Sequence, residues 1–343
     1  MSYLNNTTIE GNSSSLSNYE ISPLVRFWSY LFLDIISILC TLFVLYYLLF
    51  DRTHRQALHN HIIIVLLFIG LIYELTDIPW ILYYNYWDIP MFSTITFYLI
   101  WVFVDYAFYS AQIALFAWAT VERHILIFHD KWISTRKKRF FIHYVPIAAI
   151  PIYCFIYYCF IYFSSFCENS FDSFIAGGIY IPCLFSRTIL GSWDLIVHQV
   201  IPTLTIVIFS FLLILRVILQ KKRLNQPIKW RRHRKMTIQL LSISCIYLLF
   251  NFPWTFLVFA FQYGLPADVA YIPLLYAGYI YYYVIFLFPF VCCGSLPEIR
   301  KKFIEKLFLC RRWQPKQQKK TSSSALTSNT FENRNSKAQK TIR

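Results

Sequence analysis

Seven stretches of this chain are long and apolar enough to cross a lipid bilayer. A membrane helix needs about 20 apolar residues, because the hydrocarbon core is about 30 Å thick and a helix rises about 1.5 Å per residue. Only 14% of the residues are charged, against about 25% in soluble domains. The sequence therefore predicts an all-α membrane protein, a bundle of seven transmembrane helices. The predicted spans lie near 25–50, 60–84, 93–123, 139–163, 194–220, 236–262 and 269–294.

The basic residues predict the orientation of these spans. All of the 32 Lys and Arg except Arg26 and Arg187 lie at the end of the third span or in the segments that follow odd-numbered spans. Because cytoplasmic segments are enriched in Lys and Arg, the N-terminus is expected outside the cell and the C-terminus inside. The net charge of +15 then reflects topology and attraction to the anionic inner leaflet. The bilayer is the expected partner, nucleic acid is not, and the plasma membrane is the expected location.

The N-terminal tail carries three N-glycosylation acceptors, Asn5, Asn6 and Asn12, which agree with an outside location. No basic stretch precedes the first apolar segment, so that segment is expected to act as the insertion signal. The predicted organisation is an extracellular tail over 1–24, a seven-span domain over 25–295, a short amphipathic eighth helix over 296–310 and a disordered cytoplasmic tail over 311–343.

Several motifs follow one another in a recognisable order. Glu122-Arg123-His124 ends the third span, and basic residues precede the sixth. Pro253 lies within the sixth span and Pro289 near the end of the seventh. Over about residues 25–310 this order resembles the rhodopsin-like (class A) family of G-protein-coupled receptors.

The resemblance implies a cell-surface receptor that takes an extracellular small-molecule or peptide ligand and activates a heterotrimeric G protein. Arg123 would be its switch, held in an inactive packing by Glu122 and the basic face of the sixth span. The alternative is that the Arg123 side chain only extends to the membrane–water interface and has no switching role. Cys310, at the end of the eighth helix, is a candidate for palmitoylation. The Ser- and Thr-rich tail is either a phosphorylated site for an arrestin or a solvated linker.

The chain departs from the family pattern in the spans. Gly70 stands where the second span usually has an aspartate, so the family's sodium site is expected to be absent. Asn251 replaces the tryptophan that comes two residues before the sixth-span proline. The Asn and Tyr of the seventh-span motif are Phe288 and Cys292, and Ser210 stands for the fifth-span tyrosine. These changes put the activation switches in doubt more than the fold.

A further departure concerns the disulfide that joins the third span to the second outer loop. Tyr98 occupies the position of the cysteine that tops the third span, so the usual bridge is missing. The outer loop has its own two cysteines, Cys167 and Cys183. They face an oxidising compartment, where they either pair with each other or remain two free thiols.

Asp105 is the most informative intramembrane charge. It lies 18 residues before Arg123, which is five helical turns, so it is predicted to face the same way about 27 Å further out. Amine receptors of the resembled family keep an aspartate at this spacing, often with a tyrosine at the position of Tyr282. Two interpretations stay open: Asp105 binds an amine or cationic peptide, or it is a structural carboxylate bonded to Tyr282 or to water.

Three further residues are candidates for the same pocket. Glu74 and Asp77, three apart on the second span, are expected on one face, where they line the cavity or sit at its wet mouth. Tyr279 and Tyr282, also three apart, are the ligand-binding candidates from the tyrosine-rich seventh span.

Other classes of membrane protein remain alternatives. A transporter or channel would commonly show internal repeats and glycine-broken helices, but the chain has only eight glycines and no two similar halves. An intramembrane enzyme would need metal ligands within the spans, and all the histidines except His198 fall on or near the predicted cytoplasmic face. The seventh span lacks the lysine that a retinal-binding opsin requires. We therefore expect neither an enzyme nor a bound metal or cofactor, with a transporter, channel or non-signalling scaffold as the alternative.

Overall fold

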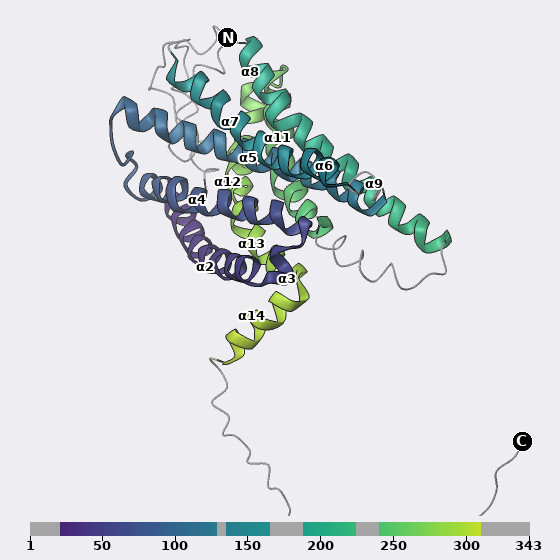
Figure 1. Cartoon of the computed structure of the whole chain (residues 1–343). Helices are drawn as coiled ribbons and strands as arrows, with labels where there is room; N and C mark the ends of the chain where they lie inside the picture. The colour runs from purple at the N-terminus through teal and green to yellow at the C-terminus, as the bar shows by residue number, and fades with distance from the viewer. Residues whose placement is uncertain (1–20, 129–134, 165–187, 224–239, 310–343) are drawn as a thin grey trace, which may run out of the picture. The chain divides into compact units, whose positions relative to one another are not determined.

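The computed structural model describes residues 21–128, 135–164, 188–223 and 240–309, and within them the regular structure is entirely helical. Seven helical spans are long and apolar enough to cross a membrane, which confirms the predicted bundle. In chain order they contain α2 (Pro23–Phe50), α4 (Leu58–Trp87), α5 (Ile95–Phe128), α7 (Val145–Phe163), α8 (Thr188–Asp194) with α9 (Ile201–Arg223), α11 (Phe252–Gln262), and α12 (Ala267–Tyr281) with α13 (Tyr283–Ser295). Figure 1 shows these helices in order along the chain.

Three short helices complete the described chain: α3 (Arg52–Arg55), α6 (Arg136–Arg139) and α14 (Pro297–Leu309). The last of these confirms a helix where the sequence predicted the eighth one. At its start Ile299 is buried, while Arg300 and Lys301 are exposed. The helix therefore begins with an apolar side and a basic side, as expected for a segment at a membrane surface.

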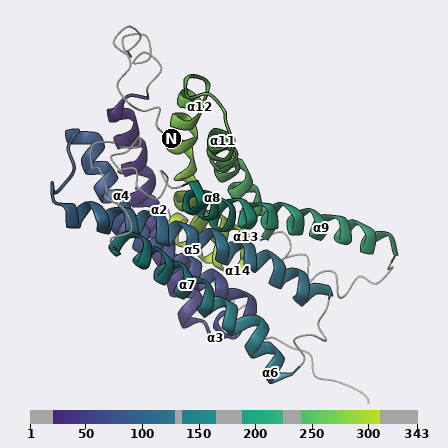
Figure 2. The same ribbon diagram turned by 90° about the horizontal axis from the view of Figure 1, so that it is seen from above.

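The third span is the centre of the bundle. Helix α5 packs against α4, α7 and α9, while α2 packs against both α4 and α13, as can be followed from above in Figure 2. In the most apolar part of α5, 67% of the residues are buried, against 11% in the fourth span. The third span is thus surrounded by protein, whereas most residues of the fourth span are at least partly exposed.

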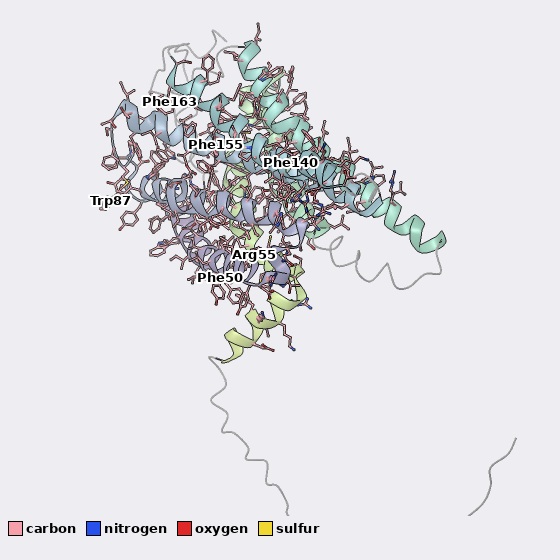
Figure 3. The ribbon with its side chains drawn as sticks, in the orientation of Figure 1. Phe50, Arg55, Trp87, Phe140, Phe155 and Phe163 are labelled. Carbon is pink, nitrogen blue, oxygen red and sulfur yellow. The ribbon has the colours of Figure 1, made fainter. Side chains whose placement is uncertain are left out.

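Large apolar side chains cover the outside of the helices, as a lipid environment requires. Phe32, Phe141 and Phe211 are each more than half exposed. Figure 3 places Arg55 and Phe140 toward one end of the bundle, and Trp87 and Phe163 toward the other. The end that carries Arg55, Arg123 and the α6 residues is called the basic end below.

In the described ranges, three π-helical turns interrupt the spans, each shortly before a proline. They are η3 (Phe140–Tyr144) before Pro146, η5 (Leu195–Val200) before Pro202 and η6 (Tyr247–Asn251) before Pro253. A proline ring clashes with the carbonyl four residues earlier, and the wider turn makes room for it. Each turn closes with a backbone bond that spans five residues, such as Ile201 N to Ile196 O. The extra residue rotates the side chains of the preceding segment relative to an uninterrupted helix.

Asp51 organises the turn between α2 and α3 at the basic end. Its carboxylate accepts a hydrogen bond of 3.0 Å from the backbone N–H of Thr53. This bond lowers the pKa of Asp51 below its usual value, so its small contribution to stability is lost as the pH falls through that lowered pKa. Lys302 Nζ lies 3.8 Å from Asp51 and 4.6 Å above the Tyr47 ring, which adds a weak, half-exposed ion pair.

Gly278 is a position where the packing of the seventh span against the sixth can be tested. A Cβ atom at Gly278 would lie 3.1 Å from the Trp254 ring, and that ring is itself stacked on Tyr281 at 5.4 Å. We expect Gly278→Ala to lower the free energy of unfolding by up to about 2 kcal/mol, because the overpacking cost of about 1–3 kcal/mol at the Trp254 ring outweighs the gain of about 1 kcal/mol for alanine inside a helix. Thermal unfolding in detergent measures the effect.

Gly70→Ala is the matched control for this substitution. A Cβ at Gly70 would make an ordinary contact of 3.6 Å with Gln112 Nε2. Alanine is about 1 kcal/mol better than glycine inside a helix, so Gly70→Ala should be neutral or stabilising. Equal stability changes in the two variants would contradict the tight contact at Trp254.

Candidate functional site

Asp105 lies inside the bundle, where three tyrosines surround its carboxylate. It is 7% exposed. Tyr73 on α4 donates a short hydrogen bond to its Oδ1, and Tyr281 and Tyr282 donate to the same oxygen at 3.5 and 3.4 Å. The contact between Asp105 and Tyr282 that the family resemblance suggested is thus present. In this closed arrangement the hydroxyl groups stabilise the carboxylate, as the structural interpretation requires.

The seventh span is interrupted at the point where it meets Asp105. Helix α12 ends at Tyr281, α13 begins at Tyr283, and Tyr282 between them is a turn residue. The chain continues with a tighter bond from Ile285 N to Tyr282 O of 3.0 Å. The two tyrosines that bond Asp105 therefore border a break in a transmembrane helix, which is a site where a span can bend.

Glu74 and Asp77 do not share one environment, although their spacing predicted a common face. Glu74, 1% exposed, accepts a short bond from Ser37 on α2. Asp77, fully buried, accepts a bond of 2.8 Å from Trp101 Nε1 on α5. Asp77 lies close enough to Asp105 for the two carboxylates to interact, so only Asp77 extends the Asp105 cluster. Neither acid sits at a wet mouth.

Tyr279 also points away from Asp105. Its hydroxyl lies 2.7 Å from Ser29 Oγ and 2.8 Å from Tyr283 Oη, and its ring is stacked on Tyr30 at 5.3 Å. These contacts attach the seventh span to α2. Of the two tyrosines chosen from the sequence, the structure brings only Tyr282 to the aspartate.

The three residues of the Glu122-Arg123-His124 motif are all buried at the basic end of α5. Arg123 is 4% exposed and lies within electrostatic range of Glu122 and of Cys292 on α13. His124 meets Phe209 edge-on at 5.6 Å. The Glu122 carboxylate is bonded to His143 at 2.5 Å, a partner that the sequence analysis did not anticipate. The basic run before the sixth span, expected to help hold Arg123, lies outside the described residues.

Asn251 joins three spans at the η6 turn. It accepts a bond of 2.5 Å from Tyr109 on α5 and donates to Thr255 at 3.3 Å and to Thr203 on α9 at 3.5 Å. Helix α11 begins at Phe252 directly after it, with Pro253 as its second residue, and Pro289 is buried within α13. An Asn at this position thus acts as a polar connector between the third, fifth and sixth spans.

A small cavity lies between the Asn251 connector and the Asp105 cluster. Its volume is about 10 Å³, and Gln112, Tyr247 and Tyr281 are among its lining residues. This volume holds about one water molecule. A ligand larger than water fits in this cavity only if its lining side chains move.

A second buried polar network was missed from the sequence. Asp194 on α8 is fully buried and bonds His198 Nδ1 at 3.0 Å. It also accepts a bond of 2.7 Å from Tyr158 on α7, whose hydroxyl lies 2.8 Å from Ser110 on α5. The sequence signal was an intramembrane acid four residues before a histidine, a spacing that places both on one helix face.

Several predicted residues lie outside the described part of the chain. They are the glycosylation candidates Asn5, Asn6 and Asn12, the cysteines Cys167 and Cys183, and the palmitoylation candidate Cys310. Within the described ranges, no group of three or more His, Cys, Asp or Glu side chains is arranged to hold a metal ion.

Comparisons with known proteins give no family for this chain. No protein-family model matches it, and no curated protein has a matching sequence. The fold and its buried polar sites therefore define the class of protein: a multi-pass membrane protein with seven helical spans.

Proposed function

We propose that this chain is a rhodopsin-like G-protein-coupled receptor that converts binding of a cationic ligand into activation of a heterotrimeric G protein. The observation that carries the proposal is the burial of Arg123, which is 4% exposed at the basic end of the central helix. An arginine near a helix end can extend to water at little cost. A guanidinium kept inside the bundle costs desolvation free energy, and an inward-facing charge in a span is by default a functional residue.

The Asp105 cluster supports the choice of a cationic ligand. Two carboxylates, Asp105 and Asp77, are buried close together. The hydrogen bonds that they accept come from neutral donors, namely Tyr73, Tyr281, Tyr282 and Trp101. A ligand ammonium would replace neutral partners by an opposite charge. An ammonium adds the attraction between two opposite charges to its hydrogen bond, and this attraction is strong where water is excluded, so a cation can displace the tyrosine hydroxyl groups.

The seventh span supplies a physical route from this cluster to Arg123. Tyr282 borders the break between α12 and α13, and α13 carries Cys292 beside Arg123. Displacing Tyr282 from Asp105 would change the bend at the break and move α13 against α5. A ligand that binds the bent and unbent states with different affinity shifts their populations, and the released basic end would receive the G protein.

Signalling by variants in cells tests this proposal. In a G-protein activation assay with a panel of amines and cationic peptides, we expect Asp105→Asn to weaken the response to an active compound by about 30-fold or more, since an unpaired partner of a buried charge costs about 2 kcal/mol or more. Tyr282→Phe should also change the response, whereas Tyr279→Phe, whose hydroxyl faces α2, should not. Arg123→Ala should abolish basal and stimulated signals at unchanged surface expression.

Silence of the surface-expressed parent with every G-protein class would count against the receptor proposal. Transport would then be the next function to test, since Asp34, Glu74, Asp77 and Asp105 are all buried acids in the spans and intramembrane acids also mark ion pathways. Uptake of a cation into vesicles that contain the parent, lost in Asp105→Asn, would identify a transporter.

A further inference from the structure

Three hydrogen-bond contacts in series join four elements at the basic end. His61 Nε2 on α4 lies 2.9 Å from the backbone carbonyl of Arg55 on α3. His61 Nδ1 lies 2.9 Å from His143 Nε2 on η3, and His143 Nδ1 lies 2.5 Å from Glu122 Oε1 on α5. We call Arg55 O, His61, His143 and Glu122 the histidine chain.

The number of protons in the histidine chain follows from its two ends. A carbonyl oxygen only accepts, and a carboxylate oxygen only accepts. Each of the three contacts needs one N–H or O–H proton, so the chain needs three. Two neutral imidazoles supply one N–H each, which makes two. In one of the three contacts, two lone pairs would therefore point at each other unless a further proton is present.

We infer that the histidine chain is a binding site for one proton, held between His143 and Glu122. With this proton, His61 donates to Arg55 O, His143 donates to His61, and the third proton lies between His143 Nδ1 and Glu122 Oε1. The pair is then either an imidazolium with a carboxylate or a neutral imidazole with a carboxylic acid. In both forms its net charge is zero, and all three contacts are hydrogen bonds.

Burial and surrounding charge place the proton at the Glu122 end. His143 is fully buried and Glu122 is 1% exposed, whereas His61 is only half-buried. Within the histidine chain, a positive charge on His61 would have no carboxylate next to it, whereas a positive charge on His143 would lie beside Glu122. The other ionisable groups on the elements around the chain are mostly cationic: Asp51, Arg52, His54, Arg55, Arg123, His124, Arg136, Lys137, Lys138, Arg139 and Tyr144.

Loss of the proton removes the hydrogen bond at the exposed end of the histidine chain, between His61 and the Arg55 carbonyl. An unpaired carboxylate in the buried position of Glu122 is more costly than an unpaired group near water. After deprotonation, His143 therefore donates to Glu122 and His61 donates to His143. His61 Nε2 then turns a lone pair toward Arg55 O, and α3 loses one of its attachments to α4. The bond from Asn60 Nδ2 to His54 O, 2.9 Å long, remains.

The Asp194–His198 pair provides an internal comparison. His198 Nδ1 donates to Asp194, and His198 Nε2 lies 3.2 Å from Tyr153 Oη. A tyrosine hydroxyl both donates and accepts, so these contacts close with a neutral histidine. A buried pair of a histidine and a carboxylate therefore needs an extra proton at His143 and Glu122, but needs none at His198 and Asp194. The inference concerns proton binding and does not depend on signalling.

Stability as a function of pH tests the site. If the folded state holds one more proton than the unfolded state above about pH 6.5, the folding equilibrium weakens by up to about ten-fold per pH unit as the pH rises toward the release of that proton. Glu122→Gln should remove this component, because the amide N–H₂ donates to His143 Nδ1 and closes the chain with neutral groups. Unfolding equilibria of both proteins in mixed micelles between about pH 6 and 9 measure the difference.

His198→Gln is the matched control, and it should keep the slope of the parent. Equal slopes in the parent and Glu122→Gln would overturn the inference. Histidine nitrogen spectra of the isotope-labelled full chain give a second measurement that needs no stable Glu122 variant. They should show the His143 Nδ1 proton displaced or shared at pH 6.5 and a change of the His61 tautomer at higher pH. A His61 tautomer that never changes between pH 6 and 9 would also contradict the site.

Discussion

Tyr158→Ala should remove most of the stability of the folded protein. Tyr158 is fully buried on α7, stacks on Tyr162 at 5.7 Å and bonds both Ser110 and Asp194. Truncating a large buried side chain costs about 3–5 kcal/mol because the cavity collapses only partly. The lost interhelical hydrogen bonds add about 1–2 kcal/mol. Domains are commonly stable by about 5–15 kcal/mol, so we expect a strongly lowered unfolding temperature and little folded protein at the surface.

Two variants separate packing from hydrogen bonding at this position. Tyr158→Phe keeps the ring and removes only the hydroxyl, so it should cost about 0.6–2 kcal/mol. Ile156→Ala removes a large side chain from the outward-facing side of the same helix, where it is 64% exposed, and should cost less than about 1 kcal/mol. If Tyr158→Phe destabilised as much as Tyr158→Ala, the polar network rather than the packing would hold α7 to α5 and α8.

The parts of this fold that the sequence predicted depend on uninterrupted helical spacing. The long apolar runs placed all seven spans because length and hydropathy act over about 20 residues. The Asp105–Arg123 relation also held, since α5 is one continuous helix without proline. Five full turns then bring both side chains inward, and Asp105 meets Tyr282 as expected.

The π-helical turns explain part of what could not be predicted. Each inserts an extra residue into a turn, which shifts the helix faces by about 100° relative to a regular helix. The three turns carry buried polar residues, namely His143 in η3, His198 in η5 and Asn251 in η6. A prediction from regular spacing does not show that these side chains face the interior. The prolines that follow the turns are visible in the sequence, but a proline alone does not show that the turn before it is widened by a residue.

A different reason applies to Glu74 and Asp77. Residues three apart differ by about 60° around a helix axis, which is one face when a helix contacts a single neighbour. Helix α4 packs against both α2 and α5, and 61% of the residues in its most apolar part are buried. On such a helix a rotation of about 60° is enough to change the neighbour, so Glu74 meets Ser37 while Asp77 meets Trp101.

The second large effect is expected at the Asp77–Trp101 pair. Trp101 is 1% exposed, packs against Phe97 at 5.6 Å and donates the bond of 2.8 Å that Asp77 accepts. Trp101→Phe removes this donor and part of a large ring. Leaving a fully buried acid without its donor costs about 1–3 kcal/mol, and the smaller ring adds a cavity. We expect a loss of about 2–4 kcal/mol in unfolding free energy.

The double variant Trp101→Phe/Asp77→Leu decides whether the acid is the cause. Replacing both partners of a buried hydrogen bond by apolar groups is far less costly than removing one, and leucine also ends the repulsion between the carboxylates of Asp77 and Asp105. We therefore expect the double variant to be more stable than Trp101→Phe by about 1–2 kcal/mol, a coupling that a double-mutant cycle measures. Additive effects within about 0.5 kcal/mol would mean that the tryptophan matters only as a packed ring. The single variant Asp77→Leu completes the cycle and shows whether this bundle keeps Asp77 against its own stability: if it is more stable than the parent, the acid is retained at a cost, as a site kept for a cation would require.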